Sequence, residues 1–132
     1  MNLLIRTVAA AAIAATAFSA PVLADRVLTG SEAQSLLAGR RFDFNCIDGT
    51  IGMASYERSG VAKAIYRSPT APETAMEETD EGRVRSAGED VCIHWQRLNF
   101  GREGCYRMTE RAPGSYRIAT LNQGRWCDLN SR

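Results

Sequence analysis

Four cysteines constrain this chain more than any other feature of its sequence. An even number of cysteines in a small exported chain is typical of a disulfide framework, and four of them allow three pairings. The cysteines lack the Cys-x2-Cys spacing that zinc sites and thioredoxin-like redox pairs use. The sequence therefore predicts two structural disulfides, with no metal site and no cofactor. The cysteines are Cys46, Cys92, Cys105 and Cys127.

Two of these cysteines flank a segment with the composition of a hairpin. Asparagine and glycine residues cluster between Cys92 and Cys105. A turn near Leu98–Asn99 would place these two cysteines opposite each other on neighbouring strands. Cys46 would then pair with Cys127 and join the first long strand to the last one. We expect this pairing, while the residues alone leave the other two pairings open.

The first 24 residues contain the three parts of a secretory signal peptide. Arg6 lies in a short charged start, residues 7–18 form an alanine-rich apolar run, and Val22-Leu23-Ala24 provides a cleavage site. The apolar run is shorter than the ~20 residues that a membrane-spanning helix needs. We therefore expect residues 1–24 to be removed and residues 25–132 to form a single small domain. The protein is expected to be periplasmic or secreted, with no membrane span after cleavage.

Composition limits what this domain can bind and how it can fold. Fifteen basic and fifteen acidic residues balance in residues 25–132. This balance argues against nucleic acid as a partner, because nucleic-acid binding needs a basic excess. Only 18 of these 108 residues are Leu, Ile, Val or Phe. Such a thin core is typical of small exported domains that disulfides reinforce.

Alternating apolar and polar residues, separated by turn signals, predict a mainly β fold. Turns are indicated at Asp48-Gly49, Ser59-Gly60, Asn99–Gly101, Pro113-Gly114 and Gln123-Gly124. The expected strands cover residues 40–46, 51–57, 61–67, 91–97, 105–111, 115–121 and 125–129. We expect an antiparallel meander of six or seven strands, arranged as a curled sheet or a small barrel.

Two segments depart from the strand pattern. Thr29-Gly30-Ser31-Glu32 has the form of a capping box, and Gly39 suits the position just after a helix end. We therefore expect one short N-terminal helix that needs packing against the sheet. Residues 68–82 contain two prolines and five acids and are expected to form a long exposed loop. A short edge strand is expected to follow at residues 83–86.

Candidate functional residues are few. The only histidine, His94, has no recognisable nucleophile or metal-binding partner in the sequence, so we expect a protein that is not an enzyme, with no catalytic residues. Arginines alternate with aromatic residues in the last strands, and side chains on one face of a sheet could bind a carboxylate, a phosphate or a ring. The alternative is that these arginines form ordinary ion pairs and that Trp95, Tyr106, Tyr116 and Trp126 belong to the core. The candidate binding face comprises Arg97, Arg107, Arg117, Arg125, Trp95 and Tyr106.

Five short motifs between Leu28 and Leu129 carry a resemblance to a known family. They are Leu37-Ala38-Gly39, Asp48-Gly49, Cys92-Ile93-His94-Trp95, Cys105-Tyr106 and Trp126-Cys127. In these motifs the chain resembles a family of small exported bacterial proteins with a short helix, a β-meander and no assigned function. The segment Phe44-Asn45-Cys46-Ile47-Asp48-Gly49 is similar, more weakly, to the Phe-x-Cys-x-x-Gly opening of periplasmic inhibitors of c-type lysozyme. Those inhibitors are small disulfide-bonded β-barrels, and their serine–glycine inhibitory motif has no convincing match here.

These observations lead to two hypotheses about function. The first is an exported, non-enzymatic binding or interaction module of the cell envelope, whose partner would be an envelope protein or a cell-wall component. The alternative follows from the weaker resemblance and is a periplasmic inhibitor of a cell-wall-cleaving enzyme, similar to the lysozyme inhibitors.

Overall fold

The structure is a computed structural model that describes residues 25–72 and 76–132. The predicted signal peptide, residues 1–24, lies outside the described residues. Eight antiparallel strands close into a barrel, in which β2 pairs with β9 and β7 pairs with both β6 and β8. The barrel strands are β2 (Arg40–Cys46), β3 (Ile51–Tyr56), β4 (Val61–Arg67), β5 (Glu78–Ala87), β6 (Asp90–Trp95), β7 (Glu103–Ala112), β8 (Ser115–Ala119) and β9 (Trp126–Ser131).

A short strand and a helix precede the barrel. Strand β1 (Arg26–Val27) pairs with Thr109 and Glu110 near the end of β7. Helix α1 (Gly30–Leu37) begins after Thr29, whose hydroxyl accepts a 3.2 Å hydrogen bond from the Glu32 amide. The Glu32 carboxylate accepts one in return from the Thr29 amide, at 3.4 Å. The predicted capping box is therefore present.

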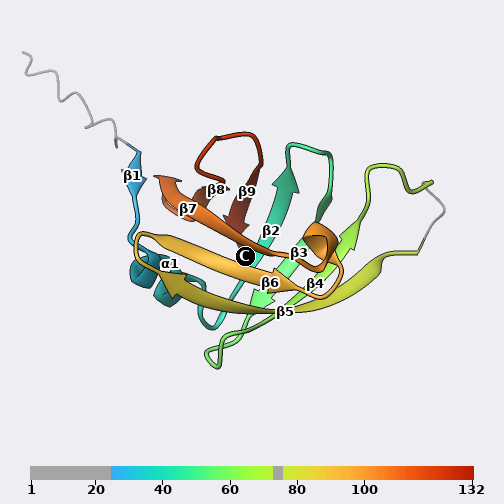
Figure 1. Ribbon diagram of the computed structural model, residues 1–132. Coiled ribbons are helices and arrows are strands. Elements are labelled where there is room, and N and C mark those ends of the chain that lie inside the picture. The colour runs from blue at the N-terminus through green and yellow to red at the C-terminus, as the bar shows by residue number, and fades with distance from the viewer. Residues whose placement is uncertain (1–24, 73–75) are drawn as a thin grey trace, which may run out of the picture.

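Helix α1 covers one end of the barrel. Leu28, Ala33 and Leu37 are each only 1% exposed, and the helix packs mainly against β5 and β6. Figure 1 shows α1 beside the β5–β6 turn, and the short 3-10 helix η1 (Leu98–Gly101) beyond the far end of β6. A side chain at Gly30 would collide with the Asp90 carbonyl, because a Cβ there would lie 2.2 Å from its oxygen. Glycine at this position allows the helix to approach the turn closely.

Inward-facing side chains fill the half of the barrel next to α1. Phe42 on β2 is fully buried, and its ring makes edge-to-face contacts with Tyr56 and Tyr116, each at a centroid distance of 6.0 Å. Met108 and Leu129 occupy inward positions on β7 and β9 and are at most 2% exposed. Aromatic side chains supply much of the buried area that the aliphatic residues of this chain cannot.

The structure confirms the mainly β fold with one short helix and resolves the arrangement as a barrel. The described residues form nine strands instead of six or seven, because β1 was not expected and the short edge strand expected at residues 83–86 is part of the full-length strand β5. The predicted loop ends at Glu78, and β5 is a ten-residue strand between β4 and β6 instead of a short edge strand. The hydrophobic pattern missed β5 because two of its inward positions hold Asp80 and Gly82. No helix among the described residues is long and apolar enough to cross a bilayer.

Both predicted disulfides are present. Cys46 on β2 is bonded to Cys127 on β9, and Cys92 on β6 is bonded to Cys105 on β7. In each pair the two cysteines lie directly opposite each other on neighbouring strands. Disulfides of this kind indicate an oxidising environment, as exported proteins encounter.

Candidate binding cavity

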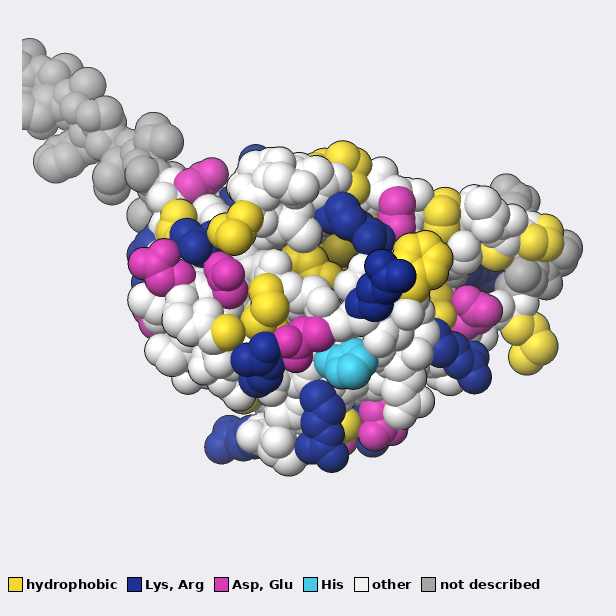
Figure 2. Space-filling model, viewed as in Figure 1, with side chains coloured by type: hydrophobic (Ala, Val, Ile, Leu, Met, Phe, Trp, Pro, Cys, Tyr) yellow, Lys and Arg dark blue, Asp and Glu magenta, His cyan; other side chains and the backbone are white. Residues whose placement is uncertain are grey.

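The end of the barrel opposite α1 contains a cavity of about 130 Å³. It lies among the β2–β3, β6–β7 and β8–β9 connections. In Figure 2, hydrophobic side chains are visible at the bottom of a hollow that has basic side chains beside it. The polar lining residues are Asp48, Thr50, Asn99 and Arg125, apart from the hydroxyls of two tyrosines. The larger apolar and aromatic lining residues are Phe44, Ile47, Tyr56, Ile93, Trp95, Leu98, Tyr106, Ile118 and Trp126.

Glycines in the barrel wall create this space. Phe44 lies opposite Gly52 across the β2–β3 pair, and Trp95 lies opposite Gly82 across the β5–β6 pair. A Cβ at Gly52 would lie 2.8 Å from the Phe44 ring, and one at Gly82 would lie 2.9 Å from the Trp95 ring. Each ring therefore rests against the backbone of the glycine instead of projecting across the barrel.

Tyr106 repeats this arrangement within a single strand. A Cβ at Gly104 would lie 2.2 Å from the Tyr106 hydroxyl oxygen, so the phenol lies flat over β7. Three aromatic rings from β2, β6 and β7 thus line the wall and leave the middle of this half of the barrel empty. An eight-stranded barrel is just wide enough either for its own side chains or for one small ligand.

The Tyr56 hydroxyl is a polar group without a protein partner in this cavity. The residue is 5% exposed, and no hydrogen bond to its hydroxyl is found among the described residues. No fully buried side-chain nitrogen or oxygen in the described ranges lacks a partner, so the Tyr56 hydroxyl is not fully buried, and Tyr56 is among the residues that line the cavity. Burial, with a smaller contribution from Tyr106, raises the pKa of the Tyr56 phenol. The hydroxyl therefore keeps its proton near neutral pH and can donate it to a ligand.

Arg125 lies at the mouth of the cavity. Its Nη1 donates a 3.0 Å hydrogen bond to Oδ1 of Asn99, which links the β8–β9 and β6–β7 connections. Burial raises the pKa of the Tyr106 phenol, and the nearby positive charge of Arg125 only partly opposes this effect. Tyr106 is therefore a second neutral phenol in the cavity, close to a cation.

The connection that carries Asn99 is held in a strained conformation. Asn99 and Phe100 have φ angles of 56° and 57°, in the left-handed region that non-glycine residues rarely adopt. One Asp80 carboxylate oxygen accepts hydrogen bonds from the Arg97 and Leu98 amides at 3.0 and 2.8 Å. Backbone strain of this kind concentrates at ligand-binding sites, where the surrounding structure holds it in place.

His94 also supports this connection. Its Nε2 lies 2.8 Å from the Gly101 carbonyl oxygen, so this nitrogen carries a proton and donates it to the carbonyl. The histidine side chain thereby fastens the end of β6 to the residues just before β7. This contact gives His94 a structural role in the loop beside the cavity.

The structure places the six residues of the candidate binding face in three different locations. Trp95 and Tyr106 line the cavity wall, and Arg125 lies at its mouth. Arg97 lines a separate groove on the outer surface, together with residues of β3, β4 and β5. The remaining two arginines, Arg107 and Arg117, lie on the outer wall and form ion pairs. The six residues therefore do not share one face of the sheet.

The two outer-wall arginines have acidic partners close by. Arg107 contacts Asp90 at 3.1 Å and Glu89 at 3.2 Å. Arg117 binds both carboxylate oxygens of Asp128, at 2.7 and 3.0 Å. This hydrogen-bonded contact with Arg117 lowers the pKa of Asp128. The ordinary ion pairs weighed as the alternative are thus present for these two arginines.

Trp126 differs from the expectation that it belongs to the core. Cys127 and Leu129 take the inward positions of β9, so the strand alternation turns Trp126 outward. Its half-buried ring lies under Arg117, whose guanidinium carbon is 3.8 Å from the ring centroid. Trp95 and Tyr116 are buried core residues, as predicted.

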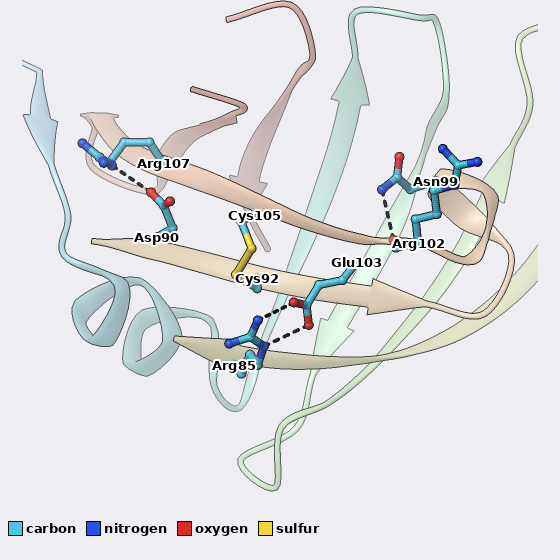
Figure 3. The surroundings of a disulfide bond; sticks show 8 residues. All are labelled: Arg85, Asp90, Cys92, Asn99, Arg102, Glu103, Cys105 and Arg107. Carbon is cyan, nitrogen blue, oxygen red and sulfur yellow. Dashed lines mark hydrogen bonds and ion pairs between the residues drawn. A yellow bond between two sulfur atoms is a disulfide. The ribbon is translucent and has the colours of Figure 1, made fainter. Parts of the chain in front are cut away.

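The residues around the Cys92–Cys105 disulfide have a structural role. Figure 3 shows the ion pair between Arg85 and Glu103 beside the Cys92–Cys105 bond. The hydrogen bonds from Arg85 lower the pKa of Glu103. Cys92, Glu103 and Cys105 are close enough together to hold a metal ion. However, both sulfur atoms are in the disulfide and are not available as thiolate ligands.

Most residues that line the cavity were not anticipated from the sequence as site residues, among them Phe44, Tyr56 and Asn99. Tyr56 appeared only as a position on an expected strand, and Asn99 appeared only as a turn residue. Phe44 appeared on an expected strand and in the motif that resembles the lysozyme inhibitors. No protein-family model, no curated protein and no solved structure matches this chain. The family resemblances therefore stay predictions, and the geometry of the cavity is the basis for a functional interpretation.

Proposed function

We propose that this protein is an exported, non-enzymatic binding module that takes a small, largely apolar ligand into the open end of its barrel. The observation that carries this proposal is the Tyr56 hydroxyl, a donor without a protein partner on a residue that lines a largely apolar cavity. A ligand with a hydrogen-bond acceptor can pair with this hydroxyl, and one such hydrogen bond contributes about 0.5–1.5 kcal/mol net.

The size of the cavity limits the ligand. Its volume is about 130 Å³. An apolar cavity of roughly 150 Å³ in another protein accepts a benzene molecule. The ligand, or the part of it that enters the barrel, is therefore about one aromatic ring or a short branched chain in size.

The binding test compares two probes of nearly equal shape, phenol and toluene. Phenol has an oxygen that can accept a hydrogen bond from Tyr56, and toluene has a methyl group in its place. We expect both to bind the purified protein with a Kd of about 1 mM, as suits ligands of so few atoms. Phenol should bind about fivefold more tightly, which corresponds to one hydrogen bond. The titrations can be followed by calorimetry or by the NMR signal of the Trp95 indole.

Variants make this test specific to Tyr56. Tyr56→Phe should remove the preference for phenol and leave toluene binding unchanged. Tyr66→Phe is the matched control, because Tyr66 is also a buried barrel tyrosine but does not line the cavity. This control should bind both probes as the unaltered protein does. The proposal is wrong if neither phenol nor toluene binds.

Export is tested separately by the intact mass of the protein recovered from the periplasm or the medium. The mass should correspond to a chain that begins at Asp25, and a full-length chain in that fraction would contradict export. Adding the protein to c-type lysozyme tests the alternative function. Loss of lysozyme activity at a stoichiometric amount would favour the inhibitor hypothesis over the binding module.

A further inference from the structure

Arg125 occupies an unusual electrostatic position for an arginine of this protein. It is the only basic residue among the described residues that line the cavity. Arg107 and Arg117 on the outer wall each contact a carboxylate, whereas Arg125 forms no ion pair within the described ranges. Its guanidinium instead donates a hydrogen bond to the neutral amide oxygen of Asn99, at 3.0 Å. The positive charge at the mouth of the cavity thus has no ion-pair partner among the described residues.

A guanidinium in this position can bind a carboxylate well. It offers five N–H donors in a planar fork, and the contact with Asn99 uses Nη1 alone. Two parallel hydrogen bonds to one carboxylate are both stronger and more specific than neutral hydrogen bonds. The same contact with Asn99 fixes Arg125 over the opening, so less side-chain freedom is lost when an anion binds.

The remaining polar groups of the cavity favour an acceptor with a single negative charge. The phenols of Tyr56 and Tyr106 both have raised pKa values and are neutral donors. Asp48 is the one acid among the described lining residues, and its Oδ1 accepts a 2.9 Å hydrogen bond from the Thr50 amide. Its negative charge partly offsets that of Arg125, which disfavours a dianion such as a phosphate monoester.

We propose that the ligand is a small apolar monocarboxylate, with its carboxylate bound by Arg125 at the mouth and its apolar body inside the barrel. This inference rests on the proposed function and specifies the chemical class of the ligand. The apolar body lies against the rings of Phe44, Trp95 and Tyr106, which line the wall.

The test uses three ring compounds that differ only in their polar group: benzoate, benzamide and phenylphosphonate at a pH where it is a dianion. Benzoate should bind about tenfold more tightly than neutral benzamide, the effect of one charge-assisted contact. Added salt should reduce this preference, because Arg125 is exposed and its charge is screened. Phenylphosphonate should bind no more tightly than benzoate.

Two variants assign the preference to Arg125. Arg125→Gln should lower the affinity for benzoate to that for benzamide. Asn99→Asp should have a similar effect, because the new carboxylate would form an ion pair with Arg125 and compete with the ligand for its guanidinium. Arg107→Gln is the matched control on the outer wall and should leave the preference for benzoate intact.

The outcomes separate this inference from the proposed function. If phenol and toluene bind but benzoate binds no better than benzamide, the ligand class is wrong and the binding cavity stands. If phenylphosphonate binds more tightly than benzoate, the monoanion assignment is wrong. If Arg125→Gln keeps the preference for benzoate, Arg125 is not the anion-binding residue. If none of the five probes binds, both proposals fail.

Discussion

The two ends of the barrel are built in different ways. At one end, α1 covers the opening, and Leu28, Ala33 and Leu37 are almost fully buried beneath it. At the other end, the connections expose large apolar side chains: Ile47 is 54% exposed, Leu121 is 71% exposed and Phe100 is 85% exposed. No helix among the described residues covers this second end like α1. The closed end has the features of a core, and the open end has those of a binding site.

The side chains inside the barrel also differ between the two ends. Their inward positions near α1 hold large side chains such as Phe42 and Met108, which fill the interior. The inward positions toward the open end include Gly52 and Gly104, on which aromatic rings lie flat. The barrel thus concentrates its packing in one half and keeps a cavity in the other. The predictions below test whether stability and binding separate in the same way.

The largest effect is expected from the disulfide at the open end. The Cys46–Cys127 bond closes a loop with a sequence separation of 81, and the Cys92–Cys105 bond closes one with a separation of 13. In the chain-entropy model these loops contribute about 4–5 and about 3 kcal/mol to the free energy of unfolding. Replacing both cysteines of each pair with serine and measuring urea unfolding should show this order. Equal losses would show that loop length does not govern the effect.

A second test compares two phenylalanines at opposite ends of the barrel. Phe42→Ala should lower the free energy of unfolding by about 3–5 kcal/mol, because Phe42 is completely buried. Phe100→Ala should change it by less than about 0.5 kcal/mol, because Phe100 is an exposed loop residue. Thermal melting of the two variants measures the difference. Similar melting temperatures for both would contradict the distinction between the two ends.

A third test uses two glycines of the open half. A Cβ at Gly52 would lie 2.2 Å from the Ile65 carbonyl oxygen, part of the backbone, so Gly52→Ala should cost about 1–3 kcal/mol of stability. A Cβ at Gly104 would displace only the end of the Tyr106 side chain. Gly104→Ala should therefore push that ring into the cavity and abolish phenol binding at a smaller cost in stability. Calorimetric binding and urea unfolding of both variants check this contrast.

The smallest effect concerns an ion pair on the outer wall, away from both ends. Because Arg117 lowers the pKa of Asp128 in the folded protein, this pair stabilises the fold above the ordinary pKa of an aspartate. Its contribution is lost as the pH falls through the lowered pKa. The melting temperature of Asp128→Asn should therefore lie below that of the unaltered protein at pH 6, and the gap should close toward pH 2. A constant gap would mean that the charge of Asp128 is not responsible.

Local chemistry made much of the fold predictable. The capping box specified the start of α1, and turn residues placed most of the hairpins where the structure has them. The disulfide between Cys92 and Cys105 followed from their symmetry about a turn near Leu98–Asn99. In each case the decisive contacts lie within a few residues or across one hairpin, so the sequence alone contains the relevant spacing.

The cavity was harder to predict because it depends on which side chains lie opposite each other on neighbouring strands of the barrel. Phe44 and Gly52 are symmetric about the Asp48-Gly49 turn, and this spacing is a sequence signal for their contact. Trp95 and Gly82 face each other only because β5 continues through residues that lack a strand pattern. The orientation of Trp126 was hard to predict for a similar reason. Alternation along β9 shows that neighbouring residues point to opposite faces, but it does not show which face is the inner one. Only the inward positions of Cys127 and Leu129 in the barrel establish that Trp126 points outward.

The measurement that tests the account most directly is an NMR map of where phenol binds. In a titration of isotope-labelled protein, the shifts should concentrate on groups at the open end, including the Trp95 indole and the methyl groups of Ile93 and Ile118. The methyl groups of Leu28 and Leu37, beneath α1, should stay unchanged. Shifts centred on α1, or no saturable shifts at millimolar phenol, would contradict the assignment of the open end as the binding site.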